Sequence, residues 1–147
     1  VGLFQATIDK VVALAVLMPI VASMGGIAGT QTLTLMIRGL ALGQVQSSNT
    51  RWLLAREIAV GLINGLAWSL VVATATLIWF RSWELGGIIA LALMANLVAA
   101  ALAGVTIPLV LQRLKVDPAL AGGVVLTTVT DVVGFTAFLG LGALLLV

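Results

Sequence analysis

The sequence predicts an all-α fold, a polytopic membrane bundle with four transmembrane helices. Of its 147 residues, 62% are hydrophobic and only 8% are charged, and the mean hydropathy is +1.27. Soluble domains average about 45–50% apolar and about 25% charged residues. Four apolar segments, each separated by a polar joint, exceed the roughly 20 residues that a helix needs to cross a bilayer. Helix is the form expected in lipid because it satisfies its own backbone hydrogen bonds.

The first apolar segment, 11–42, is longer than one crossing requires. Pro19 removes a backbone donor, so we expect the helix to be interrupted and bent there. Small residues follow, and on composition they suit close helix packing and the lining of a cavity equally well. They are Gly25, Gly26, Ala28 and Gly29. The stretch after them, beginning at Thr30 and Gln31, is unusually polar for a membrane span.

The second and third segments, 54–79 and 85–111, carry fewer polar residues. Trp79 and Trp83 lie at the joint between them, and tryptophan is enriched at the headgroup level of a membrane. Asn96 lies in the middle of the third segment. We expect its amide to hydrogen bond to a neighbouring helix rather than to serve a ligand.

The fourth segment, 118–147, contains a carboxylate within an apolar run. Asp117 is predicted to cap its helix, with Pro118 at the first helical position. Asp131 follows about 21 Å further along the helix, well inside the membrane. An ionised Asp there costs roughly 2.5–3.5 kcal/mol on insertion scales. Asp131 is therefore either protonated and bonded to a neighbouring helix, or exposed to water and a cation. We favour the second interpretation, because an ionisable residue inside a membrane span is usually functional.

Residues at helical spacing from Asp131 support a cation site. The predicted face of Asp131 also carries Thr127 and Gly134, and Gly123 continues it one turn before Thr127. These residues offer a hydroxyl and space for water. The chain has no cysteine and no histidine, so a metal must take oxygen ligands, as Mg²⁺ and Ca²⁺ do. Mg²⁺ keeps most of its waters and needs only one or two carboxylates. Two copies related by a two-fold axis would bring two Asp131 side chains to one ion.

The distribution of charge predicts orientation rather than a nucleic-acid partner. A net charge of +2 is too small to argue for nucleic acid. Five basic residues flank the joints after the first and third segments, against two on the opposite side. The positive-inside rule makes those joints cytoplasmic, with Asp117 beside them and the C-terminus outside. Because the chain opens on Val1 and an apolar stretch, we expect it to be a fragment, 1–147 being one transmembrane ion-conducting domain.

Four motifs in order resemble the transmembrane domain of the MgtE family of magnesium channels. They are 19–31 (PIVASMGGIAGTQ), 95–98 (ANLV), 117–120 (DPAL) and 128–134 (TVTDVVG). The resemblance implies a homodimer in the lipid bilayer of a bacterial-type inner or plasma membrane. Each subunit would have five helices, the first of which is mostly missing here. It also implies a Mg²⁺ pore on the dimer axis, and cytosolic Mg²⁺-sensing and CBS domains in the full-length chain.

The resemblance assigns roles residue by residue. The pore aspartate falls on Asp131, its neighbouring pore positions fall on Thr127 and Gly123, and the acidic residue at the cytoplasmic mouth falls on Asp117. Two positions depart from the family: Ile27 replaces a usual Asn, and Gly123 lies where Asn or Pro is common. Both remove polar groups, so we expect looser selectivity, with Co²⁺, Mn²⁺ or Ca²⁺ bound in addition to Mg²⁺.

Three other classes of function are alternatives to a magnesium channel: an exchanger, an enzyme and a membrane anchor. A divalent cation exchanger coupled to Na⁺ or H⁺ stays open, because one carboxylate per chain can carry one proton. An enzyme is not expected, because an intramembrane aspartyl protease needs two carboxylates that share a proton. A simple membrane anchor would leave the polar face of the fourth segment without a purpose.

Overall fold

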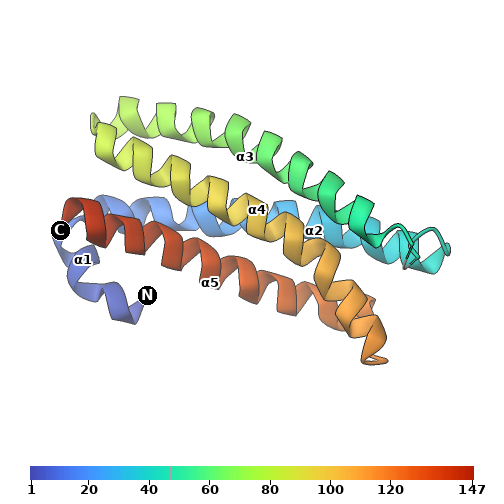
Figure 1. Cartoon of the computed structure of the whole chain (residues 1–147). Coiled ribbons are helices and arrows are strands. Elements are labelled where there is room, and N and C mark those ends of the chain that lie inside the picture. Colours follow the sequence, from blue (N-terminus) through green and yellow to red (C-terminus); the bar gives the residue numbers. More distant parts are fainter. Residues whose placement is uncertain (47) are drawn as a thin grey trace.

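The computed structural model describes residues 1–46 and 48–147, and its regular elements are helices (Figure 1). Four long helices follow a short N-terminal turn and a short helix, and each is long and apolar enough to cross a membrane. The predicted fold class is confirmed. The elements are η1 (Gly2–Phe4), α1 (Gln5–Lys10), α2 (Val12–Ala41), α3 (Thr50–Phe80), α4 (Trp83–Arg113) and α5 (Pro118–Leu146).

The helix starts follow from local sequence. The Asp117 carboxylate accepts a hydrogen bond from the Ala119 amide at 2.9 Å, and Pro118 occupies the first turn of α5. The Ser82 hydroxyl accepts one from the Leu85 amide at 3.2 Å at the start of α4. Each cap satisfies an amide that the helix itself leaves free, so the predicted cap at Asp117 is confirmed.

The predicted interruption of the first segment is wrong, because α2 continues through Pro19 as one helix, and the bend expected at Pro19 stays a prediction. A proline removes only one backbone donor from the helix. The residues around it are firmly packed: Leu14, Leu17 and Val21 are 0–4% exposed. Their burial against the other helices holds α2 together on both sides of the proline.

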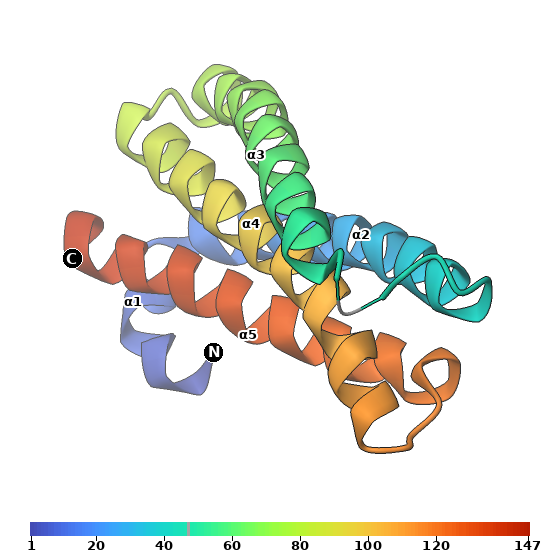
Figure 2. The same cartoon turned by 45° about the vertical axis from the view of Figure 1, so that its right-hand side comes forward.

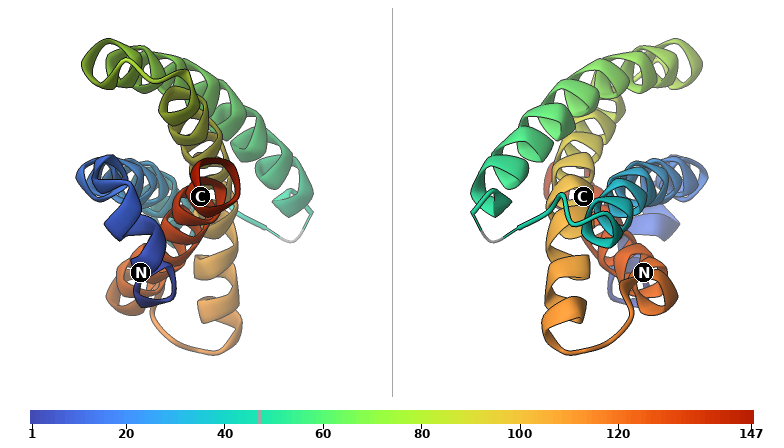
Figure 3. Two further views of the ribbon diagram at one scale, coloured as in Figure 1. Left: turned by 90° about the vertical axis from the view of Figure 1, so that its left-hand side faces the viewer. Right: turned by 90° about the vertical axis from the view of Figure 1, so that its right-hand side faces the viewer.

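Helix α4 is the centre of the bundle (Figures 1 and 2). In its most apolar stretch 61% of the residues are buried, against 17% in α3. Helices α2, α3 and α5 all pack against α4, and α2 also packs against α5. Viewed along the bundle, α3 lies at the edge, beside α4 (Figure 3).

Helices α2 and α5 run antiparallel, and glycines of one face leucines of the other. A methyl group on Gly142 would come within 2.8 Å of a Leu14 methyl carbon, and one on Gly122 within 3.1 Å of a Leu33 methyl carbon. In the middle the order is reversed, since a methyl on Gly29 would lie 3.0 Å from Leu126. The missing side chains therefore let the two backbones approach closely.

Candidate ion-binding hollow

A hollow of about 440 Å³ lies between α2 and α5 and is open to one side. Asp131 is the only charged residue among the described residues that line it. The hollow is lined by Ala22, Ser23, Gly26, Ile27, Thr30 and Gln31 of α2 and by Thr127 and Asp131 of α5. The lining thus places a single carboxylate opposite a polar strip of α2.

Two residues of the predicted stripe, Thr127 and Asp131, line the α5 side of the hollow. Asp131 is half-buried, whereas Thr127 and Gly123 are exposed one and two turns earlier. The Thr127 hydroxyl donates to the Gly123 carbonyl at 3.0 Å, so its proton is used within the helix. Its oxygen lone pairs stay free to accept from a water or to face a cation. No atom approaches within 4 Å of where a Gly123 side chain would begin.

The α2 side supplies further oxygen atoms. Ser23, Gly26 and Thr30 lie at spacings of three and four residues, which is one helical face. The Thr30 hydroxyl donates to the Gly26 carbonyl at 2.7 Å, again leaving its lone pairs free. Gly26 was predicted as a lining residue on this side, whereas Ser23, Thr30 and Gln31 were not. The signal was available, because these polar residues repeat with the helical period.

The remaining predicted pore residues lie at helix contacts inside the chain, away from this hollow. A methyl group on Gly25 or Gly134 would come within 2.2 or 2.6 Å of the Asn96 amide nitrogen. Gly29 faces Leu126. Ala28 lines two other crevices, both of which include Asn64 of α3. The small residues of α2 therefore have two different roles. Gly26 borders the hollow, whereas Gly25 and Gly29 allow close packing of the helices.

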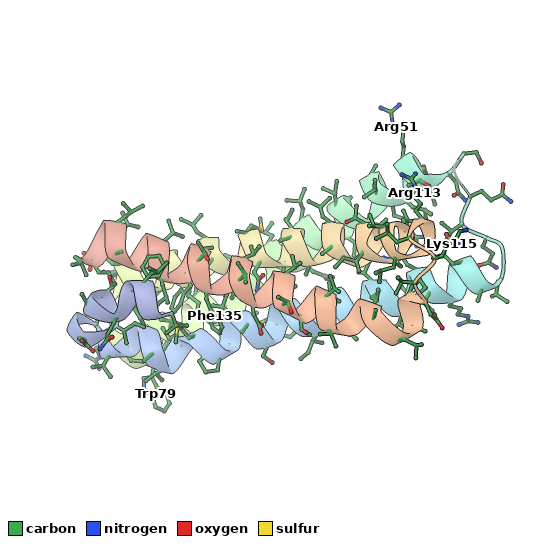
Figure 4. The ribbon with its side chains drawn as sticks, turned by 90° about the horizontal axis from the view of Figure 1, so that it is seen from below. Arg51, Trp79, Arg113, Lys115 and Phe135 are labelled. Carbon is green, nitrogen blue, oxygen red and sulfur yellow. The ribbon has the colours of Figure 1, made fainter. Side chains whose placement is uncertain are left out.

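Asp117 lies at the opposite end of α5 from the C-terminus, apart from the hollow of Asp131. It borders a separate space of about 210 Å³, formed with the end of α2 and with Gln112. The basic residues Arg51, Arg113 and Lys115 lie at this same end, and Trp79 lies at the other (Figure 4). Asp117 is thus an exposed carboxylate at the basic end of the bundle.

The donor set suits a hard cation that keeps its water. Carboxylate, hydroxyl and amide oxygens from Asp131, Thr127 and Gln31 are the ligand types that Mg²⁺ and Ca²⁺ prefer. Among the described residues there is no group of three or more His, Cys, Asp or Glu that could hold a metal ion. A single chain consequently offers one carboxylate rather than a complete protein cage.

Comparison with known proteins adds a family to this geometry. Residues 18–141 match the profile of MgtE, described as a divalent cation transporter. The chain belongs to the MgtE family. It is 34% identical to the magnesium transporter MgtE of Bacillus subtilis over 141 residues, which is 96% of this chain and 31% of the relative. The corresponding protein of Thermus thermophilus is 33% identical, over 97% of this chain and 32% of the relative.

A third MgtE relative, from Enterococcus faecalis, is 28% identical over 96% of this chain and 31% of its own length. The chain therefore spans about a third of the length of these relatives. The family that the four sequence motifs resemble is confirmed. Membership in MgtE together with four apolar helices makes this an integral membrane chain.

Proposed function

We propose that the full-length protein transports Mg²⁺ across a membrane along a path that passes the Asp131 hollow. The observation that carries the proposal is a carboxylate placed within a membrane helix, facing an open hollow whose lining includes hydroxyl and amide groups. An ionisable residue in a membrane span usually marks an ion or substrate pathway. Membership in a family of divalent cation transporters, with relatives named magnesium transporters, supports the same function.

The hollow is open enough to admit an ion that is still hydrated. Mg²⁺ binds six ligands and gives up its waters reluctantly. An ion could therefore reach Asp131 from the open side together with its waters. Asp131 would then contact the ion through water, and the uncharged oxygens of α2 would hydrogen bond to its hydration shell.

A second copy of the chain would complete the passage. The hollow opens to one side, and large apolar side chains are exposed near its lining and along α5: Ile27 by 59%, Val124 by 72% and Val132 by 60%. A two-fold related copy covering this face would bring a second Asp131 to the axis. Two carboxylates balance the charge of one divalent cation, so each copy supplies half of the site.

The orientation follows from the charged end of the bundle. Arg51, Arg113 and Lys115 lie together at the end where α2 and α4 finish (Figure 4). Under the positive-inside rule this end faces the cytoplasm and the C-terminus lies outside. Asp117 then stands at the cytoplasmic mouth of the passage, as the resemblance implies.

The proposal is tested by Mg²⁺ uptake of the full-length protein in cells that lack their own uptake systems. Asp131→Asn and Asp131→Ala are expected to lower uptake at least tenfold at equal membrane amounts, because they remove the charge that the described residues contribute to the hollow. Asp9→Asn is the matched control, since Asp9 is an exposed carboxylate of α1 and should be dispensable. Uptake by both Asp131 variants at the parent's rate would exclude Asp131 as the ion site.

The same assay in vesicles separates a channel from an exchanger. A passage of this kind moves Mg²⁺ down its own electrochemical gradient when no Na⁺ or H⁺ gradient is present. Uptake that appears only after a Na⁺ or H⁺ gradient is imposed would instead support coupled exchange.

A further inference from the structure

Asn96 of α4 is a fully buried amide at the point where α2, α4 and α5 meet. Its side chain is 0% exposed. The amide nitrogen donates to the Val21 carbonyl of α2 at 2.8 Å, which confirms the interhelical bond expected from the sequence. Its carbonyl oxygen is buried without a hydrogen-bond partner among the described residues.

Glycines on both neighbouring helices make room for this side chain. A methyl on Gly25 would lie 2.2 Å from the Asn96 nitrogen and 2.7 Å from its amide carbon. A methyl on Gly134 would lie 2.6 Å from the same nitrogen. Real side chains do not approach so closely, so a larger residue at either position would displace the Asn96 amide from its place between the helices. The amide is therefore wedged against the backbones of α2 and α5.

These contacts involve the same turns of α2 and α5 that line the ion hollow. Val21 precedes the lining residues Ala22 and Ser23, and Gly25 precedes Gly26. On the other helix, Gly134 follows Asp131 by less than one turn. Asn96 therefore contacts α2 and α5 at the level of the hollow.

Stability alone does not account for an asparagine here. A buried amide oxygen with no partner costs about 1–3 kcal/mol, and an apolar residue of similar size would avoid that cost. What the amide provides and leucine would not is a directional bond to one carbonyl of α2 together with a flat side chain that fits between two glycines.

We propose that Asn96 is a positioning residue that sets the separation of α2 and α5, and hence how far Asp131 stands from the polar strip of α2. The inference rests on the proposed function for the meaning of that distance. A change in the width of the hollow would alter how a hydrated ion is held. The side chain acts through the two helices and does not touch the ion.

The first test compares Asn96→Leu with the parent in the uptake assay with the full-length protein. We expect normal membrane amounts, at least a fivefold loss of Mg²⁺ uptake and a changed ratio of Mg²⁺ to Ca²⁺ uptake. Ser69→Ala is the control, because Ser69 is buried on α3 and its hydroxyl bonds only to Leu66 of its own helix. An unchanged ion ratio and uptake in Asn96→Leu would overturn the proposal.

The second test asks whether the effect of Asn96 depends on the close contact of its side chain with Gly25. Gly25→Ala alone is expected to lower uptake at least tenfold, because its methyl collides with the amide. Combining it with Asn96→Ala removes the collision and should raise uptake above that of Gly25→Ala, up to the lowered level of Asn96→Ala alone. A double variant no better than Gly25→Ala would overturn the proposal.

A third measurement does not depend on transport. Spin labels on Leu42→Cys and Leu120→Cys, which replace exposed residues at the neighbouring ends of α2 and α5, report the separation of the helices. These 147 residues contain no cysteine of their own, and labelled protein is diluted with unlabelled protein so that distances within one chain dominate. Asn96→Leu should shift this distance and Ser69→Ala should not. If the parent transports no Mg²⁺ but the label distance changes in Asn96→Leu, the proposed function fails and the positioning role stands. An unchanged label distance in Asn96→Leu would overturn the positioning role.

Discussion

Asp117 combines a local structural task with a charge at the mouth of the proposed passage. Its carboxylate accepts the Ala119 amide at 2.9 Å, which satisfies one of the free donors at the start of α5. It is also exposed at the basic end of the bundle, where in the proposed orientation a cation from the cytoplasm would first meet the chain. The two tasks need different properties: capping needs an oxygen acceptor, whereas attracting a cation needs negative charge.

Substitution at this residue separates the two tasks. Asp117→Ala should lower the free energy of unfolding by about 1 kcal/mol, because the cap is lost. Asp117→Asn keeps an acceptor of equal capping strength and should leave thermal stability unchanged. If the charge matters at the mouth, both variants reduce Mg²⁺ uptake at low Mg²⁺. Parent-like uptake by a stable Asp117→Asn would assign Asp117 to capping only.

Single residues show how far helical spacing predicts a site. Spacing from Asp131 correctly grouped Thr127 and Gly123 on the exposed side of α5. It grouped Gly134 with them, because in an ideal helix Gly134 points close to the direction of Thr127. The two lie about 10 Å apart along the axis, however, and Asn96 covers α5 at the level of Gly134. Spacing gives a direction around one helix, and only the crossing of neighbouring helices decides which level is covered.

At the scale of elements, glycines determine how closely the helices pack around α4. Gly104 of α4 faces α2, where a methyl would lie 2.7 Å from the Thr32 Cβ and 3.0 Å from the Gly29 carbonyl. Neither atom can move without moving the backbone of α2. The glycine thus sets the distance between α2 and α4.

Gly104→Ala is therefore expected to destabilise the bundle by about 1–3 kcal/mol through overpacking. The measurement is thermal unfolding in detergent. Gly140→Ala is the matched control: it lies in α5 with no atom within 4 Å of the added methyl, and it should be neutral or slightly stabilising. Equal stability of the two variants would mean that α2 and α4 are not held by this contact.

The four long helices followed from hydropathy, but their partners did not. Apolar runs of more than 20 residues leave little choice of structure in a membrane. Which helix becomes central depends on small residues that match particular neighbours, as Gly104 matches Thr32, and such pairs are not visible in one sequence. The continuous path of α2 through Pro19 likewise depends on packing by Leu14 and Leu17 that the sequence does not reveal.

At the scale of the whole molecule, one chain provides an incomplete hollow. The exposed side of α2 and α5 carries both Asp131 and apolar side chains such as Ile27. The opposite edge, formed by α3, is also apolar, and the crevices along it include Glu57 and Asn64 but not Asp131. The face that carries Asp131 is therefore the one where we propose that a second copy attaches.

Cysteine cross-linking tests that arrangement. Ile27→Cys in an otherwise cysteine-free full-length protein should form a disulfide-linked dimer in membranes under mild oxidation, because Ile27 borders the hollow and lies near the proposed axis. Ile78→Cys on α3 is the control, since Ile78 is 75% exposed on the far helix and should stay monomeric. Cross-linking at Ile78 and not at Ile27 would show that the dimer contact is formed by α3 and not by the face that carries Asp131.

The alternation of glycine and leucine between α2 and α5 also limits how the protein can move. Sliding α2 by one turn along α5 would bring Leu33 from its place opposite Gly122 to the level of Leu126, so that two bulky side chains would compete for one gap. A one-turn slide of α2 along α5 within one chain is therefore opposed by steric overlap. We expect α2 and α5 to move together as a rigid pair, so that opening and closing of the proposed passage takes place between the two copies of the proposed dimer.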